Sequence, residues 1–273
     1  MTKTAALVHY YFGEDSYINR IAQETVPVHL ALEGYDKTIL LRHETDLNLG
    51  SLTFELSEKA ERKATKVLLP TPANFSGSLN ELGEEGYVVD LYIFSHGYKD
   101  IFLASKDGSY KNAVGLNSAF LERHVNPLKL RMVYGCHCYG SSLNASWMKL
   151  GARVTSGARH INFYPTRFRR FVNAWNRGYS FGKAVEDSGT RLIRTPAQLY
   201  MIADAMARRS EWDGGLLSSL GVLGRFDSAE AFFSSCWLGP GEWKEGASGR
   251  ENMNSSSFMV SEGDIKITKQ VVW

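Results

Sequence analysis

Two segments of the sequence carry side chains that are suited to nucleophilic catalysis. The first, SHG at residues 95–97, follows the apolar run YVVDLYIF, and the second, CHCYG at residues 136–140, follows LKLRMVYG. The thiolate is the nucleophilic form of cysteine, but a thiol with a pKa of about 8.5 is mostly protonated at neutral pH. A nearby histidine can stabilise the thiolate as an imidazolium and later protonate a leaving group. His96 and one of the two cysteines are therefore a candidate catalytic pair.

Two predicted strands must position this pair. Residues 87–97 form a near-continuous run of β-branched and aromatic residues, which is typical of a central parallel strand buried on both faces. Residues 128–134 predict a second strand. Ligands of open α/β sheets gather at the carboxyl ends of the strands. We therefore expect His96 and a cysteine to meet at one edge of the sheet, provided that the two strands are parallel neighbours.

Strand and helix patterns alternate through about residue 195, which predicts an α/β domain with a parallel sheet and helices on both faces. Further strands are expected at 4–12, 37–43 and 152–158, and a hairpin is expected at 100–116. Residues 57–70 predict a polar helix that runs into a short strand. Helices are expected at 16–36, 74–86, 117–127, 141–151 and 165–193. Later segments predict a helix at 195–209, a loop at 245–257 and a closing strand at 264–273. We expect a catalytic domain over 1–195 and a C-terminal extension over 196–273 packed on the same domain.

The order of these blocks resembles the caspase-like cysteine peptidases, the group that contains caspases, metacaspases, legumain, gingipain, clostripain and separase. YIFSHG is similar to the histidine block of the group, and MVYGCHCYGSS is similar to its cysteine block. Residues 151–163 and 171–185 look like the strand and helix that follow the cysteine. The resemblance covers about residues 1–195. It implies a three-layer α/β/α sandwich with a mostly parallel central sheet, and a cysteine endopeptidase that forms an acyl-enzyme through a Cys-His dyad without a metal or other cofactor.

Within this resemblance, Cys138 is the expected nucleophile. A glycine follows the nucleophile of the group within two or three positions, and Gly140 follows Cys138 by two. Cys138 also lies closer to the start of the next predicted helix, whose free N–H groups carry partial positive charge. His137 departs from the small residue that the group places before the nucleophile. Cys136, which follows Gly135, therefore stays open as the alternative.

The main-chain N–H groups of Gly97 and Cys138 are expected to bind the oxyanion that develops during attack. Gly97 has no side chain, so a substrate carbonyl can approach the backbone closely. Asp90 lies six residues before His96, which is about 20 Å along a strand. We therefore exclude Asp90 as an acid that orients the histidine.

The substrate preference stays open. Members of the group that prefer basic residues often carry an acid two positions before the nucleophile, where this chain has Cys136. Other acids lie near strand ends, and three arginines could instead bind an acidic substrate side chain. These charged candidates are Glu14, Asp15, Asp100, Arg153, Arg167 and Arg169.

Two other functions also stay open. A zinc site could use residues 136–138 and His96, although Cys-x-Cys is tighter than the usual zinc-binding spacing and the chain has no second pair. Alternatively, the chain could be a catalytically inactive caspase-like binding or regulatory module. Cys236 is expected to be a small buried hydrophobe. The histidines other than His96 are expected to be structural or at the surface, with a reservation for His9 at the end of the first strand.

Composition restricts the partners. The net charge is only +2 and no dense run of Lys and Arg is present, so we expect no nucleic-acid partner. We interpret RFRRF at 167–171 as a helix face with Phe168 and Phe171 buried. No segment is long and apolar enough for a signal peptide or a membrane span. Three cysteines make no disulfide framework, which favours a reducing, cytoplasmic compartment. The expected partner is a peptide or protein substrate.

Overall fold

The computed structural model describes residues 2–12, 28–43, 59–109, 111–158, 167–189 and 259–271. Several predictions fall outside these residues. They are most of the helix over 16–36, the helix over 195–209, the loop over 245–257, the buried position of Cys236, and the sites of Glu14 and Asp15.

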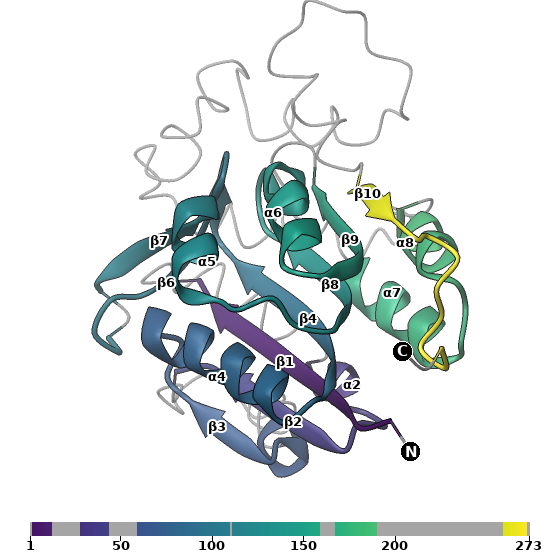
Figure 1. The fold of residues 1–273 in the computed structure, drawn as a ribbon, viewed down its shortest axis with the longest axis horizontal. Coiled ribbons are helices and arrows are strands. Elements are labelled where there is room, and N and C mark those ends of the chain that lie inside the picture. Colours follow the sequence, from purple (N-terminus) through teal and green to yellow (C-terminus); the bar gives the residue numbers. More distant parts are fainter. Residues whose placement is uncertain are drawn as a thin grey trace, which may run out of the picture.

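Within these residues, seven strands form a central sheet in the order β10-β9-β8-β4-β1-β2-β3 (Figure 1). Neighbouring strands are parallel except for β10, which is antiparallel to β9. The bounds are β1 Thr4–Tyr11, β2 Lys37–Leu41, β3 Lys66–Leu68, β4 Val88–Ser95, β8 Leu130–Cys136, β9 Ala152–Ala158 and β10 Met259–Gly263. β4 and β8 are buried along their whole length, which explains their unbroken apolar sequences. The predicted α/β class with a mostly parallel sheet is confirmed.

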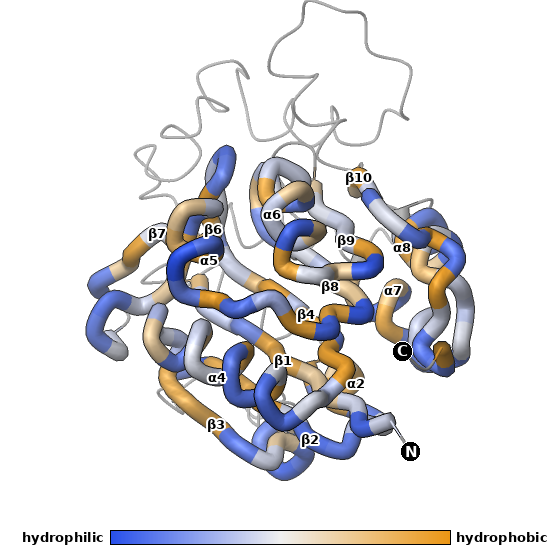
Figure 2. Tube along the Cα trace, viewed as in Figure 1, coloured by the Kyte–Doolittle hydropathy of each residue, from blue (hydrophilic) through white to orange (hydrophobic). Residues whose placement is uncertain are grey.

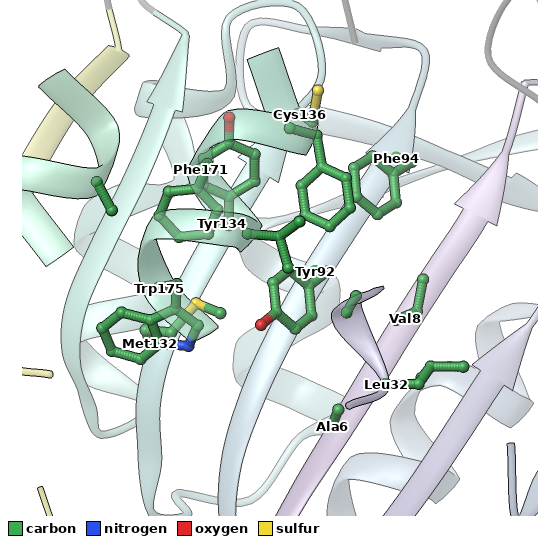
Figure 3. Close-up of a cluster of buried hydrophobic side chains, with 14 of the residues drawn as sticks. Ala6, Val8, Leu32, Tyr92, Phe94, Met132, Tyr134, Cys136, Phe171 and Trp175 are labelled. Carbon is green, nitrogen blue, oxygen red and sulfur yellow. The ribbon is translucent and has the colours of Figure 1, made fainter. Parts of the chain in front are cut away.

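Helices cover both faces of the sheet. α4 (Pro72–Glu84), α5 (Ser118–His124) and α6 (Asn144–Lys149) share one buried cluster with Leu91 and Ile93 of β4. α2 (Val28–Ala31), α7 (Arg167–Asn176) and α8 (Phe181–Gly189) share the other cluster with Tyr92 and Phe94 (Figure 3). Side chains alternate between the faces of a strand, so the two clusters lie on opposite faces. The arrangement is compatible with a three-layer sandwich.

Helix patterning follows this burial. Figure 2 shows hydrophobic residues along β4 at the centre, whereas α4 mixes hydrophilic and hydrophobic residues, as a helix with one buried face should. In α7, Phe168 and Phe171 are fully buried while Arg169 and Arg170 are exposed, which confirms the interpretation of RFRRF. Among the described residues, no helix combines the length and the apolar character that spanning a membrane requires.

The chain forms a small antiparallel sheet after β4 and before α5 in the sequence. In the described part of the chain it consists of β5 (Gly97–Tyr98), β6 (Ile101–Ser105) and β7 (Ala113–Asn117). The hairpin predicted over 100–116 is confirmed as β6 and β7. β5 was not predicted separately, because two residues carry too little pattern to indicate a strand. Its position matters because it begins directly after His96.

Three predicted element bounds differ from the structure. β8 continues through Gly135 and Cys136, beyond the predicted end at residue 134. The helix predicted over 141–151 is instead a 3₁₀ turn, Gly140–Leu143, followed by the short α6. The closing strand is β10 rather than 264–273, since the Asp264 side chain accepts a hydrogen bond from the N–H of Lys266 at 3.2 Å and forms a turn. Residues 259–263 therefore belong to the central sheet itself.

A buried ion pair fixes the C-terminal segment to the sheet. Both carboxylate oxygens of Asp90 accept hydrogen bonds from Arg131, each at 2.8 Å. Trp175 and Tyr35 also donate to Asp90, at 3.0 and 2.6 Å. Arg131 in turn donates to the carbonyl oxygen of Lys269. Asp90 is thus fully engaged with other residues, in agreement with its exclusion as a partner of His96.

Candidate functional site

The two candidate segments follow adjacent strands. β4 pairs with β8 in parallel, and the register places Phe94 opposite Cys136. The expected parallel pairing of the two strands is therefore confirmed, and both segments leave the sheet at its carboxyl edge.

Gly97 packs directly against residues 137–142, which follow β8 and are called the cysteine loop below. A Cβ atom at position 97 would lie 2.8 Å from the carbonyl oxygen of Cys138, 2.7 Å from Cδ2 of His137 and 2.8 Å from the carbonyl oxygen of Ile101. These distances leave no room for any side chain, because real Cβ atoms essentially never approach other heavy atoms so closely. From the sequence, Gly97 was expected to give a substrate carbonyl access to the backbone. The structure adds a different reason, which is contact between the two loops.

Backbone hydrogen bonds hold the residue His96 in place. Its carbonyl oxygen accepts from the Ser95 hydroxyl at 2.6 Å and from the N–H of Leu103 at 3.0 Å. Its ring is half-buried and meets the ring of Phe12 edge-on, with centroids 5.6 Å apart. Ser95 was not predicted to anchor this residue. The available signal was a hydroxyl side chain at the end of an otherwise apolar strand.

The two cysteines differ in exposure. Cys136 is the last residue of β8, only 4% exposed, and belongs to the buried cluster that contains Phe94 and Tyr134 (Figure 3). Cys138 lies beyond the strand and is half-buried. Reactive cysteines are generally at least partly exposed, whereas fully buried cysteines are inert. Exposure therefore favours Cys138 over Cys136 as a nucleophile.

His137 lies between the cysteines but points to the opposite face of the sheet from Cys136. It is buried beside Phe102, with ring centroids 5.8 Å apart. Burial, together with the nearby His9, lowers the pKa of His137 to about 3. Within the described residues, neither ring nitrogen of His137 has a hydrogen-bond partner. His137 is thus a neutral, structural side chain at neutral pH.

Glycines surround the His137 ring. Cβ atoms at Gly135 and Gly140 would lie 3.0 and 3.1 Å from Cε1 of His137, and Gly97 is in contact with the same ring, as described above. The three glycines thus make room for a ring beneath the two loops. The glycines that flank the candidate dyad in the sequence therefore also have a packing role.

The residues considered as alternative zinc ligands do not converge. Cys136 and His137 occupy opposite faces of the sheet, because successive side chains of an extended chain alternate. Throughout the part of the chain that the structure describes, no group of three or more His, Cys, Asp or Glu side chains is placed to hold a metal ion.

The helix that was expected to stabilise the thiolate starts differently from the prediction. Residues Gly140–Leu143 form a 3₁₀ turn, and α6 begins only at Asn144 and is six residues long. The effect of a helix dipole falls off within the first turn. Cys138 precedes α6 by more than one turn, so its thiolate would have to be stabilised chiefly by His96 and by nearby N–H groups.

Two strained residues lie next to the candidate pair. Among the described residues, Asp100 and Tyr139 are the non-glycine residues with positive φ, at 62° and 55°. Such a conformation costs about 1–2 kcal/mol for each residue. The N–H of Asp100 donates to Oγ of Ser142 at 2.7 Å, and that hydroxyl donates to the carbonyl oxygen of Tyr139 at 2.7 Å. Ser142 was not predicted to take part in the site.

The cysteine loop is supported from β9 as well. A Cβ atom at Gly157 would lie 2.2 Å from the carbonyl carbon of Gly140 and 2.3 Å from the nitrogen of Ser141. Gly157 pairs with Gly135 in the sheet. The backbone that follows Cys138 therefore rests directly on the backbone of the next strand.

The charged candidates for substrate recognition separate into different regions. Arg153 lies near the start of β9, at the opposite edge of the sheet, and pairs with Asp264 at 2.9 Å. The possibility that Arg153 binds a substrate side chain at the site is therefore wrong. Arg169 is exposed on α7, and Asp100 accepts a hydrogen bond from the Ser118 hydroxyl at 2.9 Å. The side chain of Arg167 lies outside the described residues.

The carboxyl edge of the sheet therefore carries a half-buried imidazole and a half-buried thiol on two touching loops. These groups are suited to attack on an electrophilic carbonyl carbon and to proton transfer to the group that leaves. Comparison with known proteins finds no matching family model and no matching curated protein, so the functional inference depends on this geometry and on the sequence.

Proposed function

We propose that the chain is a cysteine endopeptidase with a caspase-like fold, in which Cys138 and His96 form the catalytic dyad. The observation that carries the proposal is the contact of Gly97 with the carbonyl group of Cys138, at the carboxyl ends of two adjacent parallel strands. A parallel sheet with helices on both faces and an antiparallel edge strand supports the fold assignment.

In this proposal the Cys138 thiolate attacks the carbonyl carbon of the scissile peptide bond. The negative charge that develops on the carbonyl oxygen is stabilised by the N–H groups of Gly97 and Cys138. The His96 imidazolium donates its proton to the nitrogen of the peptide bond as the C–N bond breaks. The amine product leaves, and the acyl group remains attached to Cys138 as a thioester.

Water completes the cycle. Neutral His96 accepts a proton from a water molecule, and the resulting hydroxide attacks the thioester carbon. The C–S bond breaks, the carboxylic acid product leaves, and the thiolate and the imidazolium are restored. Electron pairs and protons balance without an external oxidant, reductant or metal.

A peptide-library cleavage profile tests the proposal. The wild-type chain is compared with Cys138→Ala, His96→Ala and Cys136→Ala, each checked for folding by thermal unfolding. We expect wild-type and Cys136→Ala chains to cleave peptides, and the Cys138→Ala and His96→Ala chains to lose cleavage.

Each alternative result identifies another explanation. Loss of cleavage in Cys136→Ala with retention in Cys138→Ala would assign the nucleophile to Cys136. Absence of cleavage by the folded wild-type chain, together with no labelling by thiol-reactive peptide probes, would favour the non-catalytic binding or regulatory module.

A further inference from the structure

We infer that Ser142 is a positioning residue, whose hydroxyl group couples the loop after His96 to the loop that carries Cys138. This inference rests on the proposed function, because it concerns the two loops that would hold the dyad. The residues that it involves, Asp100, Ser142 and Tyr139, are called the Ser142 bridge below.

The Ser142 bridge consists of two short hydrogen bonds through one oxygen atom. Asp100 lies in the turn between β5 and β6, where Tyr98 pairs with Ile101. Its N–H donates to Oγ of Ser142, and Oγ donates to the carbonyl oxygen of Tyr139, both at 2.7 Å. A hydroxyl group has a single hydrogen to donate. That hydrogen is donated to Tyr139, within the loop that carries Cys138. An oxygen lone pair of the same hydroxyl accepts the hydrogen bond from Asp100, in the loop after His96.

Both ends of the Ser142 bridge are strained. Asp100 and Tyr139 have φ values of 62° and 55°, a conformation that L-residues other than glycine rarely adopt. Strained backbone persists where the surrounding contacts enforce it, and it is concentrated at functional sites. At Asp100 the carboxylate is also restrained, since the Ser118 hydroxyl donates to it at 2.9 Å. The chain thus maintains two unfavourable conformations where the bridge joins the loops.

The Ser142 bridge is close to the proposed dyad on both sides. Tyr139 directly follows Cys138, and Asp100 follows His96 by four residues. Gly97 and Cys138 touch near the strand ends, so the bridge adds a second connection farther along the same loops. Two connections restrict rotation of one loop against the other, which a single contact cannot do. This restriction keeps the imidazole and the thiol in their relative orientation.

The expected effect is on the chemical step. The Ser142→Ala variant removes one of the two connections between the loops but no substrate-binding group, so kcat should fall about tenfold while KM changes less than about twofold. Ser142→Thr retains the hydroxyl and should recover most of the activity. Ser141→Ala is the matched control, since it removes the neighbouring hydroxyl, which takes no part in the bridge.

Two measurements on the 273-residue chain test the inference. The first is kcat and KM on a fluorogenic peptide chosen from the cleavage profile, with active sites counted by a covalent probe. The second is hydrogen exchange of the Asp100 amide, which does not depend on catalysis. We expect Ser142→Ala to lower kcat and to accelerate exchange at Asp100, while Ser141→Ala changes neither.

The results separate failure of the inference from failure of the proposed function. Wild-type kcat in Ser142→Ala would overturn the positioning role, and unchanged exchange at Asp100 would overturn the bridge itself. Equal losses of kcat in Ser142→Thr and Ser142→Ala would also contradict it. If the wild-type chain neither cleaves peptides nor reacts with probes, the proposed function fails, and the positioning role falls with it. Faster exchange in Ser142→Ala would then show the bridge as a structural link only.

Discussion

Gly97 and Cys138 are in backbone contact although they belong to loops that follow different strands. A Cβ atom at position 97 would lie 2.8 Å from the carbonyl oxygen of Cys138. This contact follows from the parallel pairing of β4 with β8, which brings both loops to one edge of the sheet. The relationship between the loops is therefore sensitive to the volume of the side chain at position 97.

The Gly97→Ala variant should lose both stability and activity. The added methyl group meets two carbonyl oxygens and the His137 ring at less than 3.0 Å, so one of the loops must move. We expect a destabilisation of about 1–3 kcal/mol and a loss of roughly 100-fold in kcat/KM. Urea unfolding and peptide cleavage measure the two effects.

Gly77→Ala is the matched control for this substitution. Gly77 lies within α4, and a Cβ atom there would meet nothing within 4 Å. Alanine is favoured over glycine in a helix by about 1 kcal/mol, so this variant should be slightly more stable and equally active. Wild-type activity in Gly97→Ala would contradict the described loop contact.

Gly157→Ala tests the support of the cysteine loop from β9. The new methyl group would lie 2.2 Å from the carbonyl carbon of Gly140, and backbone atoms cannot move aside as a flexible side chain can. We expect a loss of about 100-fold or more in kcat per folded molecule, measured after active-site titration. A variant with wild-type kcat would show that the position of this loop is unimportant for the reaction.

Much of the fold could be predicted from the sequence because the central strands have unbroken apolar runs. The residues of β4 and β8 need no polar alternation, since both faces are covered. Asn117 and Thr71 cap the starts of α5 and α4 through their side chains, as such residues commonly do. Short elements were harder, because β5 and the 3₁₀ turn after Tyr139 contain too few residues to show a period.

The candidate site could be predicted only in part. Residue type and position at strand ends indicate His96 and Cys138, and the structure places these two segments side by side. The Ser142 bridge could not be predicted, because it depends on the positive φ values of Asp100 and Tyr139. Neither residue is a glycine that would have indicated such a conformation.

Buried histidines should make the protein less stable in acid. Burial lowers the pKa of His137 to about 3 and that of His9 to about 4, from 6.5. Below pH 6.5 the unfolded chain binds protons that the folded chain does not. The contribution of each histidine to the free energy of unfolding is therefore fully present above pH 6.5, and it is lost as the pH decreases towards these values. Each histidine contributes up to about 1.4 kcal/mol per pH unit within this window.

Urea unfolding of His137→Asn and of the wild-type chain between about pH 7 and about pH 5 measures this effect. The variant should show a shallower decrease of the free energy of unfolding than the wild-type chain. His124→Asn, at an exposed position of α5, should retain the wild-type slope. Equal slopes for His137→Asn and the wild-type chain would show that His137 is not buried as described.

The Asp90–Arg131 pair should affect stability without affecting the chemistry. Asp90→Ala leaves the buried guanidinium unpaired, which costs about 3–5 kcal/mol. Asp90 precedes His96 by six residues, or about 20 Å along the strand, so kcat per active site should stay near the wild-type value.

Lys149→Ala, which breaks an exposed ion pair with Glu122, should change stability by less than about 1 kcal/mol. If Asp90→Ala does not fold, Asp90→Asn offers a milder disruption of the same pair. A large fall in kcat for folded Asp90→Asn, with no loss of stability, would contradict a purely structural role.

The most direct test of the central claim is to identify which side chain reacts with a thiol-reactive peptide probe. The 273-residue chain is incubated with a peptidyl acyloxymethyl ketone and digested, and the labelled residue is located by mass spectrometry. The account predicts one label on Cys138, which is lost in Cys138→Ala, strongly reduced in His96→Ala and retained in Cys136→Ala. Labelling of Cys136 instead, or the same rate of labelling at Cys138 with and without His96, would contradict it.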